Sequence, residues 1–201
     1  MAISQRLRTF LEGSRVKFTT TKHPVVYTAQ EIAASQHVPG RQLAKCVLVN
    51  TERGPVLAVL AAVQLIDIPK LKSALRANTL TIAKESDITS RFPDIDVGAM
   101  SPFGHLYEVP VVVDHGLEVS SSIVFNAGTH TDTVTMAYRD FAALAKPQMA
   151  GFGKSLAPSR PAKKTAATGK RRNASGRRTT RAPAQRSRRP AKPRTSRRPR
   201  R

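Results

Sequence analysis

Cysteine is almost absent from this 201-residue sequence, because Cys46 is its only cysteine. One cysteine excludes a disulfide within the chain and a cluster of thiolate metal ligands within it, and it suits a reducing compartment. No stretch approaches the ~20 apolar residues of a membrane-spanning helix. Residues 1–8 lack the hydrophobic segment and the small-residue cleavage site of a secretory signal. We therefore expect a cytoplasmic protein with no membrane partner.

Several familiar catalytic patterns are also missing. The sequence has no His-Glu-x-x-His, no cysteine pair and no Gly-x-Ser-x-Gly. Its five histidines, at positions 23, 37, 105, 115 and 130, are not spaced as metal-ligand pairs. This disfavours a metalloenzyme and a serine-triad hydrolase, and we expect neither a metal nor another cofactor.

Acidic residues are missing from the last quarter of the chain. All 13 Asp and Glu residues precede position 153, together with 15 of the 34 Lys and Arg residues, which leaves residues 1–152 with a net charge of about +2. Residues 153–201 hold the other 19 basic residues, and after Leu156 they include no aromatic and no large aliphatic residue. Such a segment cannot bury enough apolar surface to offset its ordering entropy. We predict one folded domain over residues 1–152 and a disordered basic tail over residues 153–201.

The predicted tail has the composition of a nucleic-acid-binding segment. Its Lys and Arg residues come in clusters, for example at 170–172, 186–189 and 197–201. Clustered cations on a flexible chain bind phosphate backbones by releasing counterions, with little sequence preference. We expect the tail to bind nucleic acid in this way, and the alternative is a solvated polycation with no specific role.

Hydrophobic patterning in the first 152 residues alternates between helical and strand periods. Apolar spacing and capping residues predict helices over residues 3–11, 28–34, 67–75, 85–92 and 138–145. β-rich runs predict strands over residues 16–21, 46–50, 56–63, 79–83, 108–114, 122–126 and 133–136. Interspersed strands and helices without long βαβ repetition indicate an α+β fold, a single domain with a mixed, curved, barrel-like β-sheet and surrounding helices.

Three segments stand out as candidates for one pocket. Lys45 begins an apolar run, and an ammonium there is costly unless it faces a cleft, where it could hold a phosphate or polarise a carbonyl. Residues 98–104 contain two glycines and a proline, so stiffly held amides could stabilise an oxyanion. His130 follows a predicted strand and could bind a substrate amine or hydroxyl, or act as an acid or base. The alternatives are a strand-edge lysine, a structural turn and a structural histidine.

Taken together, these segments resemble the YbaK family, the freestanding relatives of the editing insertion domain of bacterial prolyl-tRNA synthetase. The resemblance covers about residues 1–150 and rests on motifs at residues 43–49, 67–71, 98–104, 109–114 and 125–130. It implies hydrolysis of the ester that joins a wrong amino acid to a tRNA 3′ end, without a metal and without a protein nucleophile. Aminoacyl-tRNA would then be the partner.

The resemblance also assigns site residues. Lys45 matches the family's essential lysine, residues 98–102 match its Gly-x-x-x-Pro loop, and His130 matches a pocket position that varies among subfamilies. We therefore expect Lys45 and Gly98 to be catalytic. The expected substrate-binding residues are Ala99, Met100, Ser101, Pro102, Gly128, Thr129 and His130. Where the family often has Thr after the lysine, this chain has Cys46.

Two functions remain open at this point. The first is a trans-editing hydrolase that deacylates mischarged aminoacyl-tRNA, with the basic tail adding non-specific nucleic-acid affinity. The second is a non-catalytic nucleic-acid-binding or nucleoid-associated protein, whose YbaK-like domain only binds a ligand. The presence of Lys45, residues 98–104 and His130 favours the first.

Overall fold

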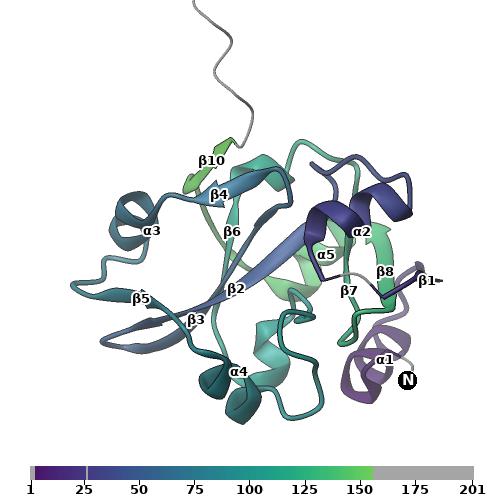
Figure 1. Ribbon diagram of the computed structural model, residues 1–201, viewed down its shortest axis with the longest axis horizontal. Coiled ribbons are helices and arrows are strands. Elements are labelled where there is room, and N and C mark those ends of the chain that lie inside the picture. Colours follow the sequence, from purple (N-terminus) through teal and green to yellow (C-terminus); the bar gives the residue numbers. More distant parts are fainter. Residues whose placement is uncertain (1–2, 26, 156–201) are drawn as a thin grey trace, which may run out of the picture. The chain divides into compact units, whose positions relative to one another are not determined.

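The computed structural model describes residues 3–25 and 27–155 (Figure 1). The α-helices in these residues are α1 (Gln5–Gly13), α2 (Ala29–Ser35), α3 (Ile68–Ala74), α4 (Glu85–Arg91) and α5 (Tyr138–Ala145). The 3-10 helices are η1 (Gly104–Tyr107) and η2 (His115–Leu117). The strands are β1 (Phe18–Lys22), β2 (Ala44–Thr51), β3 (Gly54–Ala61), β4 (Gln64–Ile66), β5 (Leu80–Ile82), β6 (Val111–Asp114), β7 (Ser122–Asn126), β8 (Asp132–Ala137), β9 (Gln148–Ala150) and β10 (Gly153–Ser155).

The described strands form three sheets. The largest has the order β5-β2-β3-β6-β9 and is mixed, because β2 runs antiparallel to β3 and β5 while β6 runs parallel to β3 and β9. A second, antiparallel sheet has the order β1-β8-β7, and β4 pairs with β10 in a third. A single parallel bridge between Leu43 and Val124 joins the first two sheets.

The α+β class and the mixed sheet are confirmed, but the barrel-like sheet is not. A barrel requires hydrogen bonding that continues from strand to strand until the sheet closes on itself. Among the described residues, β5 and β9 remain edges of the five-stranded sheet, and the Leu43–Val124 bridge is the one β-pairing between it and the three-stranded sheet. The strands therefore pack around a shared core as separate sheets.

Local capping explains where two of the helices begin. The Glu31 amide donates to Thr28 Oγ1 at 3.2 Å while the Thr28 amide donates to Glu31 Oε2 at 3.1 Å, which is the predicted capping box of α2. The Lys70 amide donates to Asp67 Oδ1 at 3.2 Å at the start of α3.

The two faces of the five-stranded sheet meet different environments. Alternate side chains of a strand point to opposite faces. Cys46 and Leu48 pack in the main core, which includes Phe103, while Val47 and Val49 belong to a second cluster. Lys45 lies on the same face of β2 as Val47 and Val49, which we call the site face.

Helix α2 covers part of the site face (Figure 1). Its Ile32 and Ala33 pack against Leu43 just before β2, Ala62 just after β3 and Val124 in the middle of β7. Lys45, two residues after Leu43, therefore lies next to the region where the two large sheets meet.

Asp114, at the end of β6, holds the start of β10 against the domain by hydrogen bonds. Its Oδ2 accepts hydrogen bonds from the Phe152 and Gly153 amides at 2.7 and 2.6 Å, and its Oδ1 accepts from the Gly116 amide at 2.9 Å and Gln64 Nε2 at 2.8 Å. Burial by itself would raise the pKa of the Asp114 carboxyl. These four hydrogen bonds outweigh burial, and the pKa lies below its ordinary value.

The first three residues of the predicted basic tail form strand β10, which pairs with β4. The rest of that tail, residues 156–201, lies outside the described residues. Among the helices of the described residues, none has the length and apolar character needed to cross a membrane.

Candidate functional site

Two of the three predicted segments are in direct contact. The Gly98 loop (residues 98–104) and the His130 turn (residues 127–131) exchange backbone hydrogen bonds, because the Gly128 amide donates to the Ala99 carbonyl at 3.1 Å. The Asp96 amide, just before the loop, donates to the Gly128 carbonyl at 3.0 Å. Two segments about 30 residues apart in sequence are thereby held side by side.

The backbone conformations at positions 98 and 128 require glycine. Gly98 has φ +90° and Gly128 has φ +101°, a backbone region that other L-residues rarely adopt. A Cβ atom at Gly128 would also lie 2.9 Å from the Cβ atom of Ser4, which is closer than real Cβ contacts. Gly98 is exposed, and its backbone is therefore the part of the loop that a ligand can reach.

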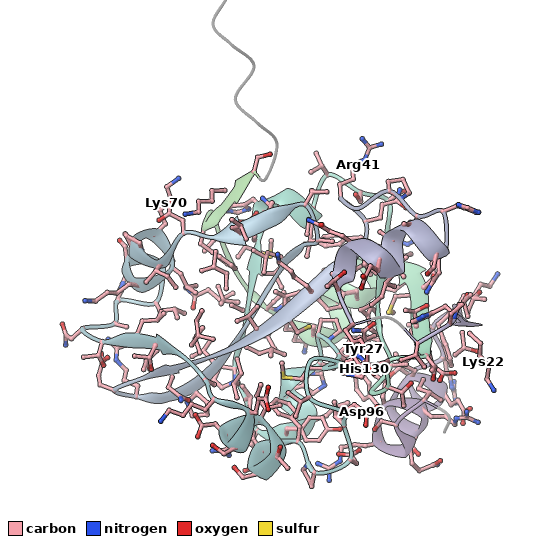
Figure 2. The ribbon with its side chains drawn as sticks, viewed as in Figure 1. Lys22, Tyr27, Arg41, Lys70, Asp96 and His130 are labelled. Atoms are coloured by element: carbon pink, nitrogen blue, oxygen red, sulfur yellow. The ribbon has the colours of Figure 1, made fainter. Side chains whose placement is uncertain are left out.

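His130 is fixed against the segment that leads into the Gly98 loop. Its Nε2 lies 3.0 Å from the Val97 carbonyl oxygen, and because a carbonyl only accepts hydrogen bonds, Nε2 carries the proton. In the neutral ring Nδ1 is then an acceptor, and this atom is buried without a hydrogen-bond partner among the described residues. The ring of Tyr27 packs over the imidazole, with 4.9 Å between ring centroids (Figure 2).

Asn126 joins the same site, although the sequence did not single it out. Its Nδ2 donates to the Gly98 carbonyl at 3.4 Å, and its Oδ1 is buried without a partner among the described residues. The available sequence signal was an amide side chain at the end of the apolar strand β7, between Phe125 and Ala127.

Lys45 lies on β2, whose start is bridged to β7. The bridge pairs Leu43 with Val124, and Lys45 and Asn126 each follow two residues later, so their side chains share one face of adjacent parallel strands. The Lys45 ammonium donates a hydrogen bond to the Gln64 carbonyl, and burial lowers its pKa. Its hydrogen bond therefore runs to the start of β4 and not to the Gly98 loop.

The remaining predicted substrate-binding residues are buried. Ala99, Met100, Ser101, Pro102, Gly128 and Thr129 all lie beneath the surface, and Met100 packs in the main core. The Thr129 hydroxyl donates to Asp132 Oδ2 at 2.9 Å. In this structure their side chains hold the shape of the loop and of the turn.

A cleft of about 720 Å³ lies at the opposite end of the five-stranded sheet, where β2 ends at Thr51. It is lined by apolar residues such as Val56 and Val111 and by the cations Arg53, Arg91 and Lys146. Lys45, Gly98 and His130 do not line it. Within the described part of the chain, no three His, Cys, Asp or Glu side chains are grouped as a metal site would need.

The thiol of Cys46 should be unreactive in the folded protein. Cys46 faces the main core, on the side of β2 opposite Lys45, and burial raises its pKa, so the reactive thiolate is scarce. We expect N-ethylmaleimide to modify the native protein at least ~10-fold more slowly than the urea-unfolded chain. Mass spectrometry over a time course measures both rates, and equal rates would contradict this placement of Cys46.

Comparisons with known proteins identify the family of this chain. Residues 23–144 match the family model of the aminoacyl-tRNA editing domain. The chain belongs to this family, in its YbaK-type form, and the match includes Lys45, the Gly98 loop and the His130 turn.

Among curated proteins, proline–tRNA ligase of Kosmotoga olearia is 32% identical over 91 residues, which are 45% of this chain and 16% of that enzyme. The chain thus spans about one sixth of the length of this relative. A solved candidate trans-editing enzyme for prolyl-tRNA synthetase superposes with a TM-score of 0.68 at 19% identity, over 76% of this chain and 97% of that one. A scaffold protein used for epitope backbone grafting gives a TM-score of 0.69 at 20% identity, with the same coverage. At these identities the two structures show a shared fold.

Proposed function

We propose that this protein is a trans-editing hydrolase that deacylates mischarged aminoacyl-tRNA. The observation that carries the proposal is the editing-domain match, which contains Lys45 and the hydrogen-bonded pair of the Gly98 loop and the His130 turn. The related segment of a proline–tRNA ligase and the likeness to a candidate trans-editing enzyme point to the same class of substrate.

The proposed reaction requires few catalytic groups from the protein. An aminoacyl ester is already activated, so a site needs to position a water molecule and to stabilise the negative charge that develops on the carbonyl oxygen. The Ala99 amide already donates to the Asp96 carbonyl. The Gly98 amide, at the exposed point of the loop, is therefore our candidate donor to the oxyanion. The neighbouring ribose hydroxyl of the substrate would assist, and neither a metal nor a protein nucleophile would be required.

Lys45 would anchor the substrate. Its side chain shares the site face with Asn126, and among the described residues its ammonium has one acceptor, the Gln64 carbonyl. We propose that a phosphate or carbonyl oxygen of the aminoacyl-adenosine end takes over as its acceptor when the substrate binds. An anionic phosphate oxygen is a stronger partner for an ammonium than a neutral carbonyl.

A panel of mischarged tRNAs tests this function. The full chain is incubated with each tRNA, with and without EDTA, and the released amino acid is measured. We expect release from at least one member of the panel, unchanged by EDTA. Binding of tRNA without release from any member would instead support the non-catalytic alternative.

We further propose that the basic tail supplies non-specific affinity for nucleic acid. A matched variant ends after Ser159, which keeps β10 and removes 18 of the 34 Lys and Arg residues. The full chain should lose ~10-fold or more tRNA affinity between 50 and 200 mM salt, because many phosphate contacts release many counterions. The shortened chain should lose much less, and equal salt slopes in a filter-binding assay would remove the tail from tRNA binding.

A further inference from the structure

We propose that Asn126 and His130 together receive the α-ammonium group of the substrate, so that the site acts on aminoacyl ends with a free amine and rejects N-blocked ends. This inference rests on the proposed function and names the substrate class of the same site. It adds Asn126 to the residues that determine specificity.

Both side chains present a buried acceptor that has no partner in the part of the chain that the structure describes. Asn126 uses its amide nitrogen on the Gly98 carbonyl, which leaves Oδ1 as an acceptor. His130 uses Nε2–H on the Val97 carbonyl, which leaves Nδ1 as an acceptor. Buried polar atoms in native proteins are rarely left unpaired. Two such acceptors, each held by the backbone at the start of one loop, indicate a donor that arrives with a ligand.

An α-ammonium group is a donor that fits these two acceptors. An α-ammonium carries three N–H donors and no acceptor, so it can satisfy two acceptors at once and gains from both. In an aminoacyl-adenosine end it lies one carbon from the ester carbonyl. A group held at Asn126 and His130 would therefore place that carbonyl next to Gly98, because the Gly98 carbonyl accepts from Asn126 and a Cβ atom at Gly98 would lie 3.6 Å from the His130 ring.

Charge around the two acceptors also fits a cation. Asp96, two residues before Gly98, is exposed, and its amide donates to the Gly128 carbonyl, so this acidic residue lies near the His130 turn (Figure 2). The cation on this face, Lys45, is held by the Gln64 carbonyl on β4. The carboxylate favours an ammonium at the His130 end, and the lysine favours a phosphate or carbonyl oxygen at the β2 end.

Tyr27 controls access to the pair. Its ring packs on the His130 imidazole, yet 73% of the residue is exposed, and its hydroxyl has no hydrogen bond among the described residues. Few contacts therefore hold the ring in place, and an entering ammonium would displace it at little cost. Tyr27→Ala should leave the preference for a free amine in place, because Tyr27 supplies no acceptor.

The test uses the full chain and two matched substrates, one mischarged tRNA and the same tRNA after acetylation of its α-amine. We expect kcat/KM for the acetylated substrate to be ~10–100-fold lower, because two hydrogen bonds to a charged donor are lost. Asn126→Leu, which has no acceptor, should bring the ratio of the two rates toward one. Asn126→Asp keeps an acceptor and should keep the ratio, and a residue with only a structural role would not separate these variants.

Binding of stable analogues separates this inference from the proposed hydrolysis. Calorimetry compares 3′-aminoacylamido-adenosine with its N-acetylated form. Tighter binding of the free amine without any turnover on tRNA would support the ammonium site and overturn the hydrolase. Turnover that is equally fast on both tRNAs, or equal affinity for both analogues, would overturn the ammonium site and leave the hydrolase standing.

Discussion

Replacing Lys45 with alanine is expected to abolish release of the amino acid from mischarged tRNA. Lys45 shares the site face with Asn126, and the proposed mechanism assigns substrate anchoring to its ammonium. Loss of a charged contact to the reacting group lowers the rate ~10²–10³-fold. Single-turnover hydrolysis, with enzyme in excess, measures this step directly.

The fold should survive this substitution. The Lys45 ammonium makes one hydrogen bond, to the Gln64 carbonyl, so thermal unfolding should change by only a few degrees. Lys70→Ala is the matched control, because Lys70 is an exposed lysine on α3, far from Tyr27 and His130 in Figure 2. It removes the same charge and should leave turnover unchanged. Unimpaired turnover in Lys45→Ala would remove Lys45 from the mechanism.

Asp114→Asn is expected to lower the free energy of unfolding by about 3 kcal/mol, more than any other substitution proposed for this protein. The carboxylate accepts four hydrogen bonds, and an amide cannot accept all of them because its nitrogen is a donor. One pair of donors, either the Phe152 and Gly153 amides or the Gly116 amide and Gln64 Nε2, would then face an N–H group instead of an acceptor. Urea unfolding measures the difference, and a matched change at the partly exposed Asp140 should cost much less.

The same substitution should alter the pH dependence of stability. The folded-state pKa of Asp114 lies below its unfolded value, so its carboxylate stabilises the fold above about pH 3.9 and loses that contribution as the pH falls through the folded-state pKa. The gap between the wild type and Asp114→Asn should therefore be constant near neutrality and shrink in acid. A gap that widens in acid would contradict the hydrogen-bonding pattern.

Local signals predicted most of the elements. Helices α2 and α3 begin where Thr28 and Asp67 cap them, and the long strands β2 and β3 follow runs of β-branched and aliphatic residues. Strands β4, β9 and β10 were missed, because these three-residue segments lie outside the β-rich runs of the sequence. They form through partners far away in sequence, such as the pairing of β10 with β4.

Only part of the candidate site could be predicted from the sequence. Residue type and spacing selected Lys45, the Gly98 loop and His130. They could not select Asn126 or Tyr27, because an amide at a strand end and an exposed tyrosine are common. These two residues stand out only in the folded chain. There Asn126 lies within hydrogen-bond distance of Gly98, and Tyr27 packs against His130.

The most direct test is to locate where an aminoacyl-adenosine end binds. Titration of the isotope-labelled full chain with 3′-aminoacylamido-adenosine, followed by NMR, reports every residue whose environment changes. The account predicts the largest shifts at Gly98, Asn126 and His130, together with the side-chain signals of Lys45. Shifts that gather instead around Arg91 and Lys146, in the cleft at the opposite end of the sheet, with Lys45 unchanged, would contradict it.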